Sequence, residues 1–320
     1  MAVLGEPNGT LQVDDNQTQP SERSQDLGNI VHLEHLNLEF HVAKGNKAQR
    51  TPLPVTLVLP EHSCLLKRLH DAATKFKGTQ FAYDQKDSHQ VTVTDPWGQL
   101  YIIVAPSDES CFDCGINDIP LPCAPGTAAA IGAFYEQVYK ARVVYKSQEG
   151  AEHASILSGP GTTVTFLESS KYRDAATAIG AFEGWHIAFY LADFSSVFNA
   201  VNSAGLNLLQ HKYSDKAPTL QEALKCSQFR MSSIIALTDS PAGGPTQFKT
   251  GETLYSFGHE LRSMYHPRRV HTSQTKTDGS NSFQGFATAI DPEYDFVLDR
   301  GHAMHLSARM HTQHYLFKRL

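Results

Sequence analysis

The sequence predicts an α+β protein built from tandem βαβββ units, because a strand and a helix recur along it at a regular spacing. Strand-like segments begin near Pro54, Asp118 and His186, and these positions lie 64 and 68 residues apart. A glycine that leads into a last strand also recurs, since Gly98 follows Pro54 by 44 residues and Gly161 follows Asp118 by 43 residues. This order of elements at a near-constant period predicts three copies of one βαβββ unit.

The third unit begins with the stretch "GWHIAFYLADF" at 184–194, in which apolar residues alternate with other residues. Because successive side chains of a strand point to opposite faces, one face is apolar and the other carries His186 and Tyr190. Asp193 is the predicted N-cap of the helix that follows, and Gly205 is its predicted C-cap. The unit is therefore a strand and a helix, with a histidine on the face that the helix leaves uncovered.

Each unit contains one predicted helix, and the third unit is longer than the others. The helices are expected at 64–76, 128–141 and 194–206. Gly251, which leads into the last strand of the third unit, follows His186 by 65 residues. The extra length predicts an insertion in the third unit, within either 210–225 or 239–249.

A further strand is expected at 31–40, but too little chain follows it for a complete unit. Only 19 residues separate His35 from Pro54, which is too few for a helix and three strands. The segment is either an isolated strand or the remnant of a truncated first unit, and we favour the second interpretation because it gives an even number of paired units. A third alternative is that the chain is a splice form that has lost part of a functional parent.

These patterns divide the chain into four regions. A polar N-terminal segment has too few large apolar residues to build a core and is expected to be disordered. The predicted regions are a disordered tail at 1–29, an N-terminal pair of units with a truncated first unit at 30–108, a C-terminal pair at 109–266, and a polar, His-rich extension at 267–320.

Composition and charge favour a soluble, cytoplasmic protein. The 27 basic and 33 acidic residues give a net charge of −6, which argues against nucleic acid or an anionic membrane as the main partner. The sequence shows no apolar run of the length that spans a membrane and no order of residues typical of a secretion signal. The 5 cysteines, an odd number spread over a long chain, favour reduced thiols in the cytosol.

Four motifs together resemble the vicinal oxygen chelate superfamily, which includes glyoxalase I, bleomycin-resistance proteins and extradiol dioxygenases. The motifs are "EHLNL", "GTAAAIGAFYEQVYKARV", "GWHIAFYLADF" and "DPWGQLYIIV". They are similar to the family's opening His-Φ-x-Φ strand, its helix ending in Phe-Tyr, and its Asp-Pro-x-Gly turn into the last strand. The resemblance covers 30–266. It implies paired βαβββ modules that form cupped mixed sheets, with helices on the outer faces.

The resemblance also implies a divalent metal on the concave face, held by residues of first and last strands. His186 and Asp118 match the first-strand ligand position. Glu260 matches the last-strand position, because the alternation of "YSFGHELRS" places it on the face opposite to the apolar one. One imidazole and two carboxylates would suit Fe, Mn or Zn. His35 also matches a first-strand position, but its partner strands are missing from the sequence.

Three more residues are candidates for catalysis if the protein is an enzyme. Arg262 and His266 follow Glu260 closely and could bind an anionic substrate or move a proton, and Tyr190 shares the face of His186. The family's reactions include those of isomerases, lyases and dioxygenases, and the residues do not choose among them. The alternative interpretation of Glu260 is an ion pair with Arg262 or Arg230.

Two other motifs carry weaker signals. The pair Cys111 and Cys114 has the spacing of a zinc half-site, but the sequence offers no second CxxC, so a linker is the favoured interpretation. The terminal motifs "HAMH" and "HTQH" could chelate adventitious metal.

Two functions are therefore predicted for a protein whose partner is a small-molecule ligand or substrate. The leading hypothesis is a metal-binding glyoxalase- or dioxygenase-like protein acting on a small oxygenated metabolite. The alternative is a metal-free small-molecule-binding or scaffold protein of the same fold. A truncated first unit would also expose sheet edges, which a homodimer partner or a tail could cover.

Overall fold

The computed structural model describes most of the chain from residue 48 to residue 266 and three short strands outside it. The described residues are 30–32, 39–41, 48–60, 62–107, 115–148, 150–159, 161–174, 185–211, 215–238, 247–266 and 304–307. The predicted disordered tail at 1–29, the histidine at 35, the cysteine pair at 111 and 114, and most of the His-rich extension lie outside the described residues.

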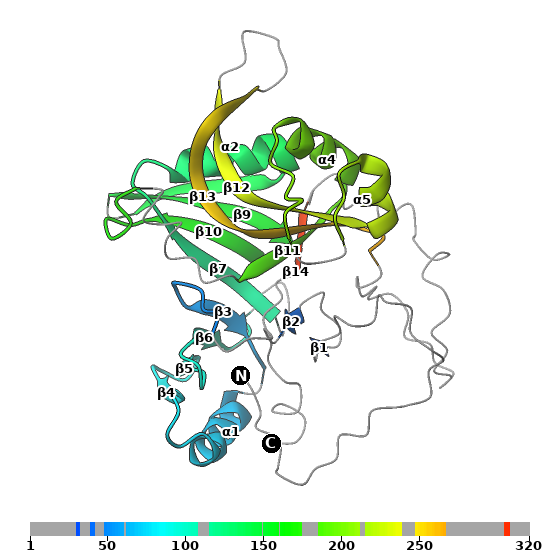
Figure 1. Cartoon of the computed structure of the whole chain (residues 1–320). Coiled ribbons are helices and arrows are strands. Elements are labelled where there is room, and N and C mark those ends of the chain that lie inside the picture. The colour runs from blue at the N-terminus through cyan, green and yellow to red at the C-terminus, as the bar shows by residue number, and fades with distance from the viewer. Residues whose placement is uncertain are drawn as a thin grey trace, which may run out of the picture.

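Three βαβββ modules follow one another along the chain, as predicted (Figure 1). Module A consists of β3 (Val55–Val58), α1 (His62–Lys75), β4 (Ala82–Gln85), β5 (Gln90–Thr94) and β6 (Leu100–Val104). Module B consists of β7 (Gly115–Cys123), α2 (Ala128–Tyr139), β8 (Arg142–Gln148), β9 (Ala151–Gly159) and β10 (Thr162–Glu168). Module C consists of β11 (His186–Leu191), α4 (Phe194–Ser203), α5 (Leu220–Cys226), β12 (Gln228–Thr238) and β13 (Gln247–Ser263).

In every module the first and last strands are parallel neighbours, although they lie far apart in the sequence. β3 pairs with β6, β7 with β10, and β11 with β13. In modules A and B the two middle strands extend the sheet by antiparallel pairing, and in module C the middle strand β12 pairs antiparallel with β13. Such a parallel pair requires a crossover, which the chain between the two paired strands supplies.

Modules A and B share one sheet of eight strands in the order β4-β5-β6-β3-β7-β10-β9-β8. The two halves are joined by antiparallel pairing of their first strands, in which Thr56 lies opposite Asp118. This pairing connects residues on both sides of residue 108, where the sequence predicts a boundary between two module pairs. The division into module pairs therefore stays a prediction. The sheets are divided differently, because modules A and B share one sheet and module C has its own.

Module C forms a separate sheet in the order β12-β13-β11-β14, where β14 (Met304–Ser307) pairs antiparallel with β11. Its second strand is reduced to one bridge between Asn207 and Met231, with a hydrogen bond from the Leu208 amide to the Arg230 carbonyl at 2.8 Å. The helix α5 lies between this bridge and β12. The segment 210–225, one of the two predicted places for the insertion, thus contains most of α5, and most of the other, 239–249, lies outside the described residues.

The predicted N-cap of α4, Asp193, is confirmed, and the predicted C-cap, Gly205, lies one residue after the observed C-cap Ala204. The Asp193 carboxylate accepts a hydrogen bond from the Ser196 amide at 3.2 Å, which satisfies one of the free amides of the first turn. At the other end Gly205 has a φ of +69°, and the next amide, that of Leu206, donates to Val201 at 3.0 Å. Glycine adopts this left-handed conformation at little cost, so it ends the helix here.

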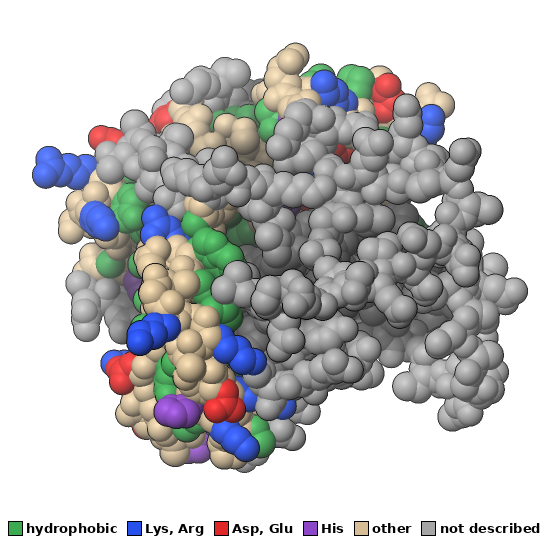
Figure 2. Space-filling model, turned by 60° about the horizontal axis from the view of Figure 1, so that its bottom comes forward, with side chains coloured by type: hydrophobic (Ala, Val, Ile, Leu, Met, Phe, Trp, Pro, Cys, Tyr) green, Lys and Arg blue, Asp and Glu red, His purple; other side chains and the backbone are tan. Residues whose placement is uncertain are grey.

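The helices α1 and α2 differ in what covers them. α1 buries one stripe, including Leu65 and Leu69, and its other positions make a polar surface with charges of both signs (Figure 2). α2 is apolar almost all round and buries residues on more than one side. It packs on β8 and β9 of its own module and also on β12 and α4 of module C (Figure 1). None of the described helices is long and apolar enough to cross a membrane.

The predicted continuous strand at 31–40 is wrong. Two three-residue strands, β1 (Ile30–His32) and β2 (Glu39–His41), pair with each other in antiparallel orientation. One uninterrupted strand cannot pair with itself in this way. Alternation of polar and apolar residues does not distinguish one strand from two strands of a hairpin.

A buried tyrosine–histidine contact ties α2 of module B to β13 of module C. The Tyr135 hydroxyl lies 2.8 Å from His259 Nε2, and His259 Nδ1 lies 3.1 Å from the Phe257 carbonyl oxygen. Because the carbonyl can only accept, Nδ1 carries the proton and Nε2 accepts from Tyr135. The ring of His259 is 1% exposed, and burial lowers its pKa to about 3.

The protonation of His259 should make stability depend on pH. In the unfolded chain its pKa is about 6.5, so between about pH 6.5 and pH 3 the unfolded state binds the proton and the folded state does not. The free energy of unfolding should therefore fall by about 2 kcal/mol from pH 7 to pH 5 through this group alone. Urea titrations at both pH values should show a smaller fall for His259→Gln than for the wild type.

His89→Gln is the matched control, because His89 is exposed on the turn between β4 and β5. An equal fall in all three proteins would contradict the prediction.

Candidate functional site

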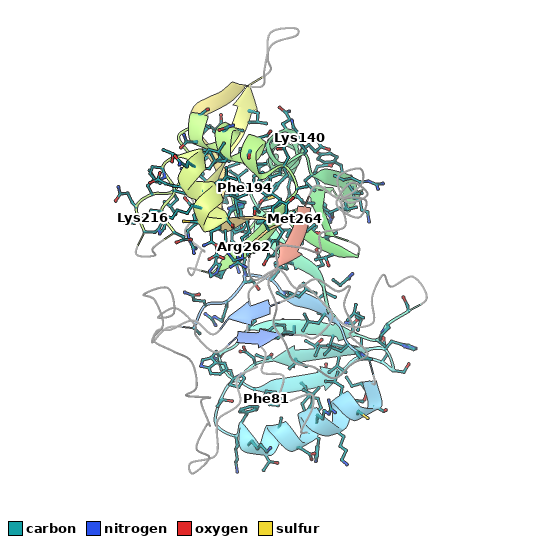
Figure 3. The ribbon with its side chains drawn as sticks, turned by 90° about the vertical axis from the view of Figure 1, so that its right-hand side faces the viewer. Phe81, Lys140, Phe194, Lys216, Arg262 and Met264 are labelled. Carbon is teal, nitrogen blue, oxygen red and sulfur yellow. The ribbon has the colours of Figure 1, made fainter. Side chains whose placement is uncertain are left out.

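Parallel pairing of β11 with β13 gathers polar side chains on one face of module C. In register, His186 lies opposite Gly258, and Tyr190 lies opposite Arg262. The opposite face carries rings that pack under α2, such as Phe189 stacked on His259 with centroids 5.4 Å apart. The polar face predicted from alternation is therefore present. Figure 3 shows Arg262 on the lower side of module C and Phe194, from the helix side, above it.

Glu260 is held between two arginines at the centre of this face. Arg230 Nη2 donates to Glu260 Oε1 at 2.5 Å, and Arg262 Nη2 donates to Oε2 at 2.7 Å. The Glu260 side chain is only 3% exposed and that of Arg262 only 1%. Buried charges persist only where partners and hydrogen bonds offset the loss of hydration, and here each carboxylate oxygen faces a guanidinium. Both ion pairs of the alternative interpretation of Glu260 are present.

The two arginines have further partners that extend the network in both directions. Arg230 Nε donates to Asp215 Oδ2 at 2.8 Å, and Asp215 comes from the chain between α4 and α5. Arg262 Nε donates to Gln228 Oε1 at 3.2 Å, and its Nη1 donates to the Tyr190 hydroxyl at 3.2 Å. Burial alone would lower the pKa of Arg230, but Glu260 and Asp215 raise it above its ordinary value.

His186 lies beside the network without a hydrogen bond to it. Its Nε2 atom is 3.8 Å from Glu260 Oε1, too far for a hydrogen bond. Within the described part of the chain this buried nitrogen has no hydrogen-bond partner. Burial lowers the pKa of His186 below its ordinary value, while Glu260 and Asp215 act to raise it and Arg230 and Arg262 to lower it. The imidazole is therefore neutral at pH 7.

The three predicted catalytic residues lie next to one another. The ring of His266 is 6.2 Å from that of Tyr190, in an edge-on arrangement. The guanidinium of Arg262 lies 5.7 Å from the centroid of the same tyrosine ring. The structure thus brings Tyr190, Arg262 and His266 together with His186 and Glu260, and their catalytic or metal-binding roles stay predictions.

Asp118 is not brought to this face, because its strand belongs to the eight-stranded sheet. Its Oδ1 atom accepts from the hydroxyls of Thr163 at 2.6 Å and Thr165 at 2.7 Å. Burial raises the pKa of Asp118, and these hydrogen bonds act in the opposite direction. Among the residues that the structure describes, no group of three or more His, Cys, Asp or Glu side chains is placed to hold a metal ion.

Glu168, which ends the last strand of module B, has a structural partner. Its Oε1 atom accepts from the Ala128 amide at 3.1 Å, at the first residue of α2. The cap residue Thr127 makes no such bond with its own side chain. A carboxylate at a helix N-terminus satisfies a free amide and lies in the favourable field of the helix dipole.

Sequence reasoning missed two members of the network, Asp215 and Gln228. Gln228 and Arg230 alternate with the apolar Phe229 and Met231 at the start of β12, and this alternation could have indicated a polar face. Asp215 carries no comparable signal. It reaches the face only because the inserted segment folds back over β12.

Removal of the Glu260 charge should be strongly destabilising. Glu260→Gln would leave two buried guanidiniums with a neutral partner, and breaking a buried pair costs about 3–5 kcal/mol. Glu168→Gln, which keeps an acceptor at the partly buried start of α2, should cost about 1 kcal/mol or less. Urea unfolding of both variants measures the difference. Equal, small losses would show that the Glu260 network does not stabilise the fold.

Gly258 should be required for the position of His186. A Cβ atom at 258 would lie 2.8 Å from the Cβ atom of His186, closer than real Cβ contacts allow. Gly258→Ala should therefore cost about 1–3 kcal/mol by overpacking. The cost should shrink in a His186→Gly background, where the clashing atom is gone. A double-mutant cycle on unfolding free energies tests this, and strictly additive effects would refute it.

No protein-family model matches the sequence, and no curated protein matches it. Comparison with solved structures finds glyoxalase I from Zea mays, with 10% sequence identity, a TM-score of 0.34, and 66% of each chain covered. The present chain thus spans just under two thirds of the maize chain.

Two further solved structures illustrate the range of the matches. A mutant of the fosfomycin resistance protein FosX from Listeria monocytogenes, complexed with Mn(II) and 1S,2S-dihydroxypropylphosphonic acid, is 11% identical, with a TM-score of 0.22 and coverage of 46% of this chain and 90% of that chain. The 2,2′,3-trihydroxybiphenyl 1,2-dioxygenase from Sphingomonas wittichii strain RW1 is 13% identical, with a TM-score of 0.28 and coverage of 68% and 91%.

The tandem βαβββ modules confirm the predicted fold class, and the solved structures with which the chain shares similarity come from throughout the glyoxalase/bleomycin resistance/dioxygenase superfamily.

Proposed function

We propose that the chain binds a small oxygenated molecule without a divalent metal, on the face of module C that carries His186, Tyr190, Glu260 and Arg262. The observation that carries this proposal is the position of Glu260, whose two oxygens each accept from an arginine at 2.5 and 2.7 Å. This function is the metal-free alternative of the sequence analysis. The fold favours a small-molecule ligand, because the sheet presents a polar face that no described helix covers.

The donor set at this face does not fit the metal that the resemblance implies. A divalent cation bound by Glu260 would replace hydrogen bonds from Arg230 and Arg262 and would lie close to both positive charges. At low dielectric such repulsion is large. The other predicted carboxylate ligand, Asp118, bonds to threonines in the other sheet. His186 alone is the remaining donor of the predicted set, and one imidazole does not make a site for Fe, Mn or Zn.

The first test is metal content, measured on protein purified without a tag and incubated with Fe, Mn or Zn. We expect no stoichiometric metal and no change in melting temperature on addition of each metal to the full chain. Histidines of the C-terminal motifs could bind metal on their own account, so a His302→Ala/His311→Ala/His314→Ala variant is the control. One equivalent of metal that survives in this control, and is lost in His186→Ala, would overturn the proposal.

The second test is a ligand screen in the presence of EDTA. Diols, hydroxy acids and α-keto compounds should include ligands that raise the melting temperature of the wild type. His186→Ala should weaken their binding about tenfold or more, which corresponds to about 1.4 kcal/mol. Asp118→Asn is the matched control, because it alters a polar residue of the other sheet and should leave binding unchanged. Ligands that bind both variants equally would place the site elsewhere.

A further inference from the structure

We infer that the ligand of module C is an uncharged molecule that carries hydroxyl groups, rather than an anion or a cation. This inference rests on the proposed function and adds the chemical class of the ligand. It follows from the charge balance of what we call the charge cluster, the side chains of Asp215, Arg230, Glu260 and Arg262 that surround His186.

The charge cluster is balanced among the described residues. The four charged side chains nearest to His186 are two carboxylates and two guanidiniums. They alternate in space, because Asp215 bonds to Arg230, Arg230 to Glu260, and Glu260 to Arg262. Lys216 lies next in the chain, but it is exposed and sits at the outer edge of the module in Figure 3. As far as the described residues go, the face is therefore polar without a net charge.

A charged ligand would disturb this balance. A carboxylate that approached Arg262 would compete with Glu260 for it and would lie within reach of both buried anions. An ammonium group that approached Glu260 would meet the two guanidiniums in the same way. Either ion would lose its hydration and gain no unpaired counter-charge among the described residues, which is the costly case for burial of an ion. A neutral molecule does not incur this cost.

Two buried atoms, one in the charge cluster and one in His186, indicate which functional group the ligand should carry. Within the described residues, His186 Nε2 and Asp215 Oδ1 are buried and make no hydrogen bond, whereas Asp215 Oδ2 accepts from Arg230 and Gln228. The Nδ1 atom of His211 faces Asp215 Oδ1 at 3.9 Å, beyond hydrogen-bond distance. Unsatisfied buried polar atoms are costly, so a ligand that satisfies them gains affinity. Asp215 Oδ1 can only accept and therefore needs a donor. A hydroxyl group donates to it, and it matches His186 Nε2 in either tautomer, because it both donates and accepts.

The experiment uses three probes that share a phenyl ring and a benzylic hydroxyl and differ in charge. They are 1-phenyl-1,2-ethanediol, which is neutral, mandelate, which is an anion, and 2-amino-1-phenylethanol, which is a cation at pH 7. Binding to the full-length protein is measured by ligand-observed NMR in EDTA, up to about 10 mM probe. We expect the diol to bind about tenfold more tightly than either ion, with an affinity that does not change with salt concentration.

A single isosteric substitution should shift this preference. Asp215→Asn keeps an acceptor for Arg230 and gives the cluster a net charge of +1, so mandelate should gain about tenfold relative to the diol. Asp84→Asn is the matched control, because it makes the same change of charge on the exposed strand β4 of module A. It should leave the ratio of the two affinities unchanged.

The outcomes separate the two proposals. Tighter binding of mandelate or of the amine by the wild type, weakened by His186→Ala, would overturn the inference of a neutral ligand and leave the proposed function standing. Binding of none of the three probes would contradict the proposed function and the inference together. An Asp215→Asn variant with the wild-type ratio of affinities would show that the charge cluster does not set ligand charge.

Discussion

The parallel pairing of the first and last strand of each module is the constraint on which the rest of the structure depends. Strand-to-strand pairing of this kind needs a crossover, so each module carries at least one helix and one further strand between the paired strands. In module C this pairing brings His186 beside Gly258 and Tyr190 beside Arg262, across more than 70 residues of sequence in each case. The polar face exists because of this register. Without it, Glu260 and His186 would have no common environment.

Glu260 decides what that environment can do. As a ligand for a metal it would need free oxygens, and both are bonded to guanidiniums. As the centre of an alternating row of charges it lies in a buried, ion-paired surface whose described charges balance. The fold alone therefore does not determine the chemistry of the polar face. A family resemblance identifies positions, and the neighbours of each position determine its chemistry.

Local sequence patterns predicted most of the helices and strands, but they could not predict the contacts between modules. The helix caps at Asp193 and Gly205 and the two faces of β11 follow from short-range sequence, and the structure contains them. The place of Asp118 could not be predicted, because it depends on which first strands pair, and β7 pairs with β3 rather than with β11. Asp215 was missed for a related reason, since only the path of the inserted segment brings it to Arg230. The division of the predicted strand at 31–40 into β1 and β2 left no signal in the alternation of polar and apolar residues.

The position of α2 has a consequence for how the molecule unfolds. A helix that is apolar on nearly every side and packs against two sheets belongs to the core of both. Modules B and C therefore cannot separate without exposing α2, Tyr135 and His259 included, to water. They form one cooperative unit despite belonging to different sheets, whereas α1 shares no such contact and module A depends on the others mainly through the β3–β7 ladder. The parts of this chain that unfold together therefore differ from the parts that share a sheet.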